Sequence, residues 1–276
     1  MKIGFNSVLF GEFDIEKSFI AAKEIGYSGI ELSALDPAMG QHIDESLRVS
    51  ENIEIINKLS NKYDIPVTAI ERAKHDLSSW EYIVQVAEGI GCPIVNIGPG
   101  GKYDENGIPI SEGAFDSALD SLKKHSEISN KYNVTTCFKA HYNTCIDNTD
   151  LCIKAIKELE GYQIGLDFDP SHIFRVPENT FDALKQVIPW IKHIHIRDCV
   201  APDIQGPGSP LEQICGRGQI DLEKIMKLLS DNSYKGPINL EVIGSKANGL
   251  SIETCTIIAA ESKGWLNNIL SRLKLI

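Results

Sequence analysis

The chain has 276 residues, of which 42% are hydrophobic and 24% are charged, with a formal net charge of −11. This balance is ordinary for a globular domain with one large core, and it argues against a nucleic-acid partner because phosphate binding normally requires a basic surface. No stretch approaches the roughly 20 consecutive apolar residues of a membrane span.

Apolar, strand-like runs alternate with longer segments of helical period along the whole chain, which is typical of βαβ units and a parallel sheet. The expected strands are residues 2–8, 29–34, 66–71, 93–98, 134–140, 163–168, 191–197 and 237–243. The expected helices fall within residues 14–26, 45–63, 79–91, 113–132, 148–161, 180–190, 221–236 and 251–273. Eight such units with right-handed crossovers close most naturally into a barrel. The sequence therefore predicts an α/β protein with a single (β/α)₈ TIM barrel domain over residues 1–276.

Metal-ligand side chains lie at the ends of the last three expected strands. Asp169 and His172 stand in GLDFDPSH, His195 in KHIHIR and Glu241 in NLEVI. The carboxyl ends of barrel strands converge on one pocket, where such barrels carry their chemistry. Imidazole and carboxylates together suit a divalent transition metal. We therefore expect Asp169, His195 and Glu241 to bind one metal ion.

The DPSH segment leaves two questions open. Asp167 and Asp169 point the same way if the strand runs that far, and Asp169 is the better ligand because Pro170 ends the strand just after it. Asp167 is then expected deeper in the barrel, paired with a cation. The alternative interpretation is that DPSH is a turn in which Asp169 caps the next helix.

The fifth expected strand ends in CFKAHYN, which places Lys139 and His141 on one face. Lys139 either forms a structural ion pair with an aspartate or, beside a metal, has a lowered pKa that makes it a proton acceptor or a stabiliser of an enolate oxygen. His141 is a candidate fourth metal ligand. With His172, these two residues are our candidate catalytic groups.

Four residues near the ends of the expected strands are candidates for substrate binding. They are Asn6, Glu71, His172 and Arg197. Glu31, inside GIEL, is as well explained by packing within the barrel as by a role in the site.

The segments GYSGIELSA, DPSH, HIHIRD, GRGQIDLEKI and YKGPINLEV, in this order, resemble the xylose isomerase-like barrel superfamily, which includes sugar isomerases, ketose 3-epimerases, inosose dehydratase and the endonuclease IV branch. The resemblance implies that Asp169, His195 and Glu241 bind a divalent metal and that His172 contacts the substrate. The family commonly has a glutamate ligand at the end of the fifth strand, where this chain has Lys139. In the epimerases that glutamate is one of two acid/base groups.

The resemblance implies a metal-dependent isomerase or epimerase that abstracts a proton next to the metal-bound carbonyl of a keto sugar or sugar derivative. Mn²⁺ is the expected ion, with Co²⁺, Mg²⁺ or Zn²⁺ as alternatives. Because Lys139 replaces one carboxylate, a lyase or dehydratase acting on a keto-glycoside or an inosose is the second interpretation. The third is a non-catalytic barrel that forms one subunit of a complex.

The expected partner is a small carbohydrate-type substrate, with neither nucleic acid nor membrane, and the sequence leaves open a homo-oligomer or a hetero-oligomeric complex. The first residues read as a strand and show no signal-peptide pattern, and the seven cysteines form no CxxC pair. These features predict a cytoplasmic protein with reduced thiols.

Overall fold

A computed structural model describes residues 1–100, 113–176, 178–202 and 206–276. Its eight parallel strands pair in chain order, and β8 pairs with β1, so that they form a closed barrel. The strands are β1 (Ile3–Asn6), β2 (Ile30–Ala34), β3 (Val67–Arg72), β4 (Ile94–Ile97), β5 (Thr135–Lys139), β6 (Ile164–Phe168), β7 (Ile191–Ile196) and β8 (Ile238–Leu240). The predicted TIM barrel is therefore confirmed.

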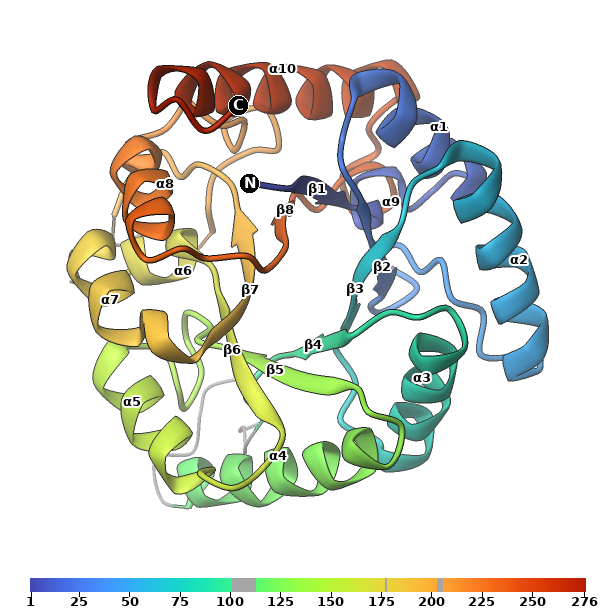
Figure 1. Ribbon diagram of the computed structural model, residues 1–276, viewed down its shortest axis with the longest axis vertical. Helices are drawn as coiled ribbons and strands as arrows, with labels where there is room; N and C mark the ends of the chain where they lie inside the picture. The colour runs from blue at the N-terminus through green and yellow to red at the C-terminus, as the bar shows by residue number, and fades with distance from the viewer. Residues whose placement is uncertain (101–112, 177, 203–205) are drawn as a thin grey trace.

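Helices surround the barrel in a single ring, with α10 lying between α8 and α1 (Figure 1). The longer ones are α1 (Ile15–Ile25), α2 (Val49–Tyr63), α3 (Leu77–Gly89), α4 (Ala114–Lys131), α5 (Thr149–Glu158), α7 (Thr180–Val187), α8 (Leu222–Asp231) and α10 (Ile252–Arg272). Short helical segments η1 (Ser7–Phe10), α6 (Pro170–Phe174) and α9 (Ser245–Asn248) were not expected from the sequence, whereas η2 (Ile188–Trp190) lies at the end of the helix expected within residues 180–190. Among the described residues, no helix is long and apolar enough to cross a membrane.

The main hydrophobic core lies between the strands and the helices, whereas the inside of the barrel is polar. Alternate residues of each strand point inward, and fully buried polar side chains in the barrel strands include Glu31, Asn96, His193, His195 and Asn239. Gly4 belongs to the same inner face, because a Cβ there would collide with the Asn239 side chain. A barrel interior usually consists of branched apolar residues, so the buried polar side chains in this barrel point to a functional site.

Candidate active site

A cavity of about 720 Å³ opens at the carboxyl ends of the strands. Its inner wall includes Glu71 of β3, Lys139 of β5, His172 of α6, Arg197 just after β7 and Glu241 just after β8. All five are buried. Side chains from distant parts of the sequence thus meet at the end of the barrel where the sequence predicted a site.

Lys139 occupies the centre of this wall. Its Nζ lies 3.0 Å from Glu241 Oε2, 3.2 Å from Glu71 Oε1 and 3.8 Å from Asp167 Oδ2. Burial alone would lower the pKa of Lys139, but the surrounding carboxylates outweigh burial and raise that pKa well above its ordinary value. Lys139 is therefore a buried cation paired with carboxylates, as in the ion-pair interpretation of the sequence, and a lowered pKa beside a metal ion stays a prediction.

His195, on β7, lies between the carboxylates of Glu31 and Asp167. Its Nε2 is 2.5 Å from Glu31 Oε2, and its Nδ1 is 2.9 Å from Asp167 Oδ2. Burial opposes the charged imidazole, yet Asp167 and then Glu31 raise the pKa of His195 well above its usual range. Asn96 Nδ2 donates to the other oxygen of Glu31 over 2.7 Å, which holds that carboxylate in place.

Asp167 also contacts His193, whose Nδ1 lies 2.8 Å from Asp167 Oδ1. The opposite ring nitrogen of His193 lies 2.8 Å from Asn239 Nδ2. Because an amide nitrogen donates only, His193 Nε2 accepts this hydrogen bond and Nδ1 donates to Asp167. Asp167 therefore lies deep in the barrel beside cationic and polar partners, in accord with its expected pairing.

Asp169 and Arg197 form a second charged group beside the first. Arg197 Nη2 is 2.9 Å from Asp169 Oδ2, and its Nε donates to Ser171 Oγ over 2.8 Å. Asp169 Oδ1 accepts from the backbone N–H of Ser171 and caps α6. The capping interpretation of DPSH is therefore correct for one oxygen of Asp169, while the other oxygen pairs with Arg197.

His172 lies against this second group and is neutral. Its Nδ1 accepts from the Tyr142 backbone N–H at 3.1 Å and lies 2.7 Å from Arg175 Nη2, while its Nε2 lies 3.1 Å from Arg197 Nη2 and 3.5 Å from Asp169 Oδ2. Burial, followed by the neighbouring His141 and Arg197, holds the pKa of His172 well below its ordinary value.

His141 stands at the rim of the cavity, where its ring is solvent-exposed and lies 4.0 Å from the His172 ring. Its Nδ1 is 3.0 Å from the Tyr142 carbonyl oxygen, which can only accept, so Nδ1 carries the proton and Nε2 keeps its lone pair. Desolvation by the cavity wall and then the charge of Lys139 lower the pKa of His141 to about 4. His141 is thus a neutral imidazole with Nε2 available as a proton acceptor.

Two sets of three buried donors lie close enough together to hold a metal ion, each set within 4.8 Å. One set is Glu71, His195 and Glu241; the other is Glu31, His193 and His195. The first set lies at the cavity wall, and its two carboxylates and one imidazole fit a divalent ion. Asp167 Oδ2 lies 2.9 Å from His195 Nδ1, next to this set.

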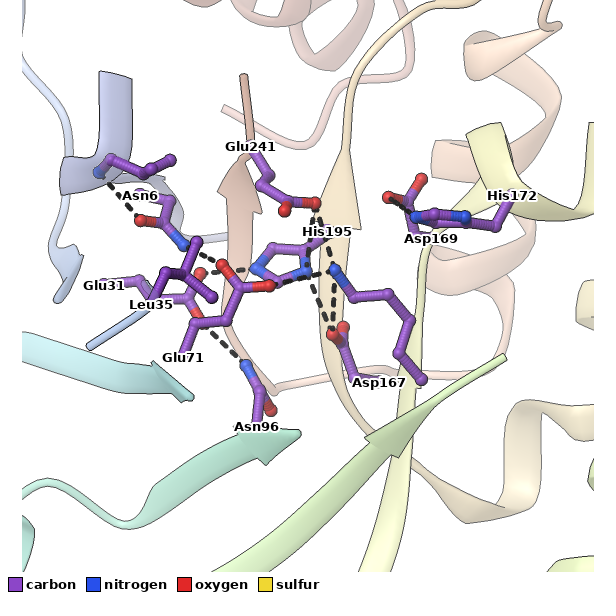
Figure 2. A network of polar contacts seen from close by, with 12 residues as sticks. Asn6, Glu31, Leu35, Glu71, Asn96, Asp167, Asp169, His172, His195 and Glu241 are labelled. Atoms are coloured by element: carbon purple, nitrogen blue, oxygen red, sulfur yellow. Dashed lines mark hydrogen bonds and ion pairs between the residues drawn. The ribbon is translucent and has the colours of Figure 1, made fainter. Parts of the chain in front are cut away.

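The four metal ligands predicted from the sequence do not all belong to these two sets. His195 and Glu241 belong to the set at the cavity wall, whereas Asp169 and His141 belong to neither set. Figure 2 shows Asp169 and His172 together at one side of the group formed by Glu71, His195 and Glu241. The ligand assignment of Asp169 and His141 stays a prediction.

Of the four residues predicted to contact the substrate, three line the cavity and one does not. Glu71, His172 and Arg197 line the cavity, whereas Asn6 lies behind Glu71 and donates to its Oε2 over 2.6 Å. Glu31, left undecided from the sequence, supports His195. The sequence does contain a signal for supporting residues such as Asn6 and Glu31. A polar side chain at an inward-facing position of an otherwise apolar strand is costly to bury alone, so it indicates a polar partner inside the barrel.

A family model described as xylose isomerase-like TIM barrel matches residues 19–268. The chain belongs to this family. Among curated proteins, it is 26% identical to an inosose dehydratase of Clostridium botulinum (strain Alaska E43 / Type E3) over 153 residues, which are 51% of this chain and 49% of that protein. The chain thus aligns with about half the length of that relative.

Solved structures of the family share the fold at low sequence identity. The probable 3-DHS dehydratase AsbF of Bacillus anthracis has a TM-score of 0.75 at 17% identity and covers 97% of this chain and 99% of its own. The IOLI protein, whose crystal structure has a bound zinc atom, also has a TM-score of 0.75 at 17% identity, with 99% of both chains covered. At this identity, the similarity shows the barrel alone.

Proposed function

We propose that this family member is an enzyme that removes a proton from the carbon beside the carbonyl of a sugar-type ketone and then expels a β-substituent, as a dehydratase or related lyase. The observation that carries the proposal is the juxtaposition of a neutral proton acceptor, His141, with two buried cations, Lys139 and Arg197, in one cavity. Abstraction of such a proton requires a base and positive charge near the oxygen that becomes negative.

His141 is the proposed base. The Tyr142 carbonyl fixes the proton on Nδ1, and the packed His172 ring orients the imidazole, so that Nε2 is the basic atom. Lys139 and Arg197 are both buried, which strengthens their attraction for an enolate oxygen relative to the same charges in water. His172, neutral and held by Arg175 and Tyr142, positions the base and the substrate.

We further propose that the site uses a divalent metal, held by Glu71, His195 and Glu241, with Asp169 retained as a candidate ligand from the sequence. When bound, such an ion would polarise the substrate carbonyl. Support comes from the donor set itself and from the zinc atom in the IOLI protein. Mn²⁺ stays the ion expected from the sequence.

Elimination is favoured over epimerisation by the residue at the end of β5. The epimerases that this chain resembles use two carboxyl groups on opposite faces of the sugar carbon, one to remove the proton and one to return it, and this chain has Lys139 in place of one of them. The relatives described as inosose dehydratase and as probable 3-DHS dehydratase support the same choice. The carboxylate pair of Glu71 and Glu241 keeps an isomerase or epimerase as the second candidate.

The proposal is tested by incubating the protein with inososes and 3-keto sugars in D₂O, with Mn²⁺ or Zn²⁺ added. We expect exchange of the C–H beside the carbonyl and a product that has lost water or an aglycone; a product of unchanged covalent structure apart from deuterium indicates isomerisation or epimerisation. His141→Gln should lower kcat by about 10²–10⁴-fold without changing the melting temperature. His42→Gln, outside the cavity, is the matched control, and full activity of H141Q would exclude His141 as the base.

A further inference from the structure

A lysine ammonium stands among the side chains that are proposed to bind the metal. Glu71 and Glu241 each contact Lys139 Nζ directly, at 3.2 and 3.0 Å, and Lys139 is only 5% exposed. A cation that belongs to the chain itself therefore already lies between these two carboxylates.

We infer that Lys139 is the resident cation of this site: it holds Glu71 and Glu241 together without a metal, and a divalent ion binds to both carboxylates only by displacing the ammonium. The first half concerns the folded chain alone, and the second half rests on the proposed metal-dependent function.

Both oxygens of Glu71 already have a partner. Its Oε2 accepts from Asn6 Nδ2 over 2.6 Å, and its Oε1 is the atom that contacts Lys139. Glu241 uses Oε2 for Lys139, and the same oxygen is the one that lies 3.5 Å from His195 Nδ1. The ammonium thus already occupies Glu71 Oε1 and Glu241 Oε2, the oxygens that face the space between the two carboxylates, and a metal at that place competes with it.

A displaced ammonium has another acceptor within reach. Lys139 and Asp167 are partners in the register between β5 and β6, and Asp167 Oδ2, which is paired with His195 Nδ1 at 2.9 Å, lies 3.8 Å from Nζ. The lysine stem is flexible and its charge is compact, so a short movement toward Asp167 keeps the ammonium paired. Without any cation between them, Glu71 and Glu241 would be two buried carboxylates in mutual repulsion.

The test compares Lys139→Met and Lys139→Arg with the wild-type protein. Melting temperatures are measured in EDTA and with Mn²⁺ or Zn²⁺, and metal affinities by isothermal titration calorimetry. We expect K139M to melt at a lower temperature in EDTA, to regain the loss with metal, and to bind metal at least roughly tenfold more tightly than wild type because the competing charge is gone. K139R, which keeps a cation, should resemble wild type in EDTA.

Lys263→Met is the matched control. Lys263, on α10, is also buried, but its ammonium lies over the ring of Tyr27, away from the cavity. It should leave metal affinity unchanged. The inference is overturned if K139M binds metal no more tightly than wild type, if wild type is as sensitive to EDTA as K139M, or if K139M stays unfolded at saturating metal. Failure of the proposed reaction appears separately, as the absence of ketone turnover in a wild-type protein with these binding properties.

Discussion

The two buried cations of the barrel mouth are held in different ways. Lys139 is a point charge shared by carboxylates of three strands or strand ends, at 3.0 to 3.8 Å. Arg197 is fixed by directional contacts, with Nε on Ser171 Oγ and Nη2 on Asp169 Oδ2. An ammonium on a flexible stem can exchange partners, whereas a planar guanidinium loses its hydrogen bonds when it turns. The Lys139 side is therefore the exchangeable half of the site, and the Arg197 side is its fixed frame.

Glu241 belongs to both halves, which gives its substitution the largest expected effect. Its carboxylate contacts Lys139 at 3.0 Å and lies 3.5 Å from Arg197 Nη2. Glu241→Gln removes the charge that pairs with both cations and one proposed metal ligand, so kcat/KM should fall by about 10³-fold or more. Glu261→Gln, an exposed glutamate paired with Arg217, is the control and should keep full activity. A loss below tenfold in E241Q would show that the two halves work independently of Glu241.

Arg197→Met tests the fixed half through stability. It leaves Asp169 buried without its cation, and loss of one partner of a buried pair costs about 3–5 kcal/mol of the free energy of unfolding. Urea denaturation measures the change. Arg217→Met, an exposed arginine paired with Glu261, should cost less than about 1 kcal/mol. Equal losses for the two variants would contradict the assignment of Arg197 as a structural frame.

The sequence was sufficient for the architecture because each strand and helix carries its own signal. Alternation of apolar runs with helical periods located all eight strands, and the order of the strand ends located the mouth. It also located Lys139, Asp169 and Glu241 at that mouth. The short segment α6 was read as a loop, since five residues starting at Pro170 give no helical period.

The pairing of charges was beyond the sequence. Asp169 was grouped with His195 and Glu241 because all three lie at the ends of neighbouring strands. In the structure, Asp169 instead forms an ion pair with Arg197, two residues after His195. Strand order determines which residues share the mouth, but ångström-scale side-chain geometry decides which carboxylate meets which cation. The pKa of Lys139 depends on the same detail, because three carboxylates within 4 Å reverse the effect of burial.

Glu31→Gln tests how the metal site depends on the residue that holds His195, and we expect a moderate effect on metal affinity. Glu31 lies 2.5 Å from His195 Nε2 and forms no ion pair with Lys139 or Arg197 among the described residues, so it acts as a positioning residue. Loss of its charge should weaken metal affinity about 10–100-fold, as observed when the partner of a metal-binding histidine is removed. Calorimetric titration with Mn²⁺ measures this, and Glu31→Asp should restore part of the affinity. An unchanged affinity in E31Q would exclude His195 as a ligand.

The smallest effect is expected at an ion pair on the helical layer, where Lys62 Nζ lies 2.6 Å from Glu16 Oε1. This distance is shorter than any contact of Lys139, but the two side chains are 55% and 38% exposed, so solvent screens the attraction. Hydrogen bonds from Lys62 and then Tyr63 lower the pKa of Glu16 below its ordinary 4.5. The contact therefore stabilises the fold above that pH, and the stabilisation is lost as the pH falls through the lower pKa of the folded state.

Glu16→Gln should accordingly lower the melting temperature by less than about 4 °C at pH 7, and the difference from wild type should shrink as the pH is lowered toward about 3. Thermal melts across this pH range measure both quantities. If E16Q lost as much stability as R197M, distance rather than burial would govern these ion pairs, and the division of the mouth into an exchangeable and a fixed half would lose its physical basis. A difference that grew on acidification would contradict the direction of the Glu16 shift, because protonation removes the charge that the substitution removes.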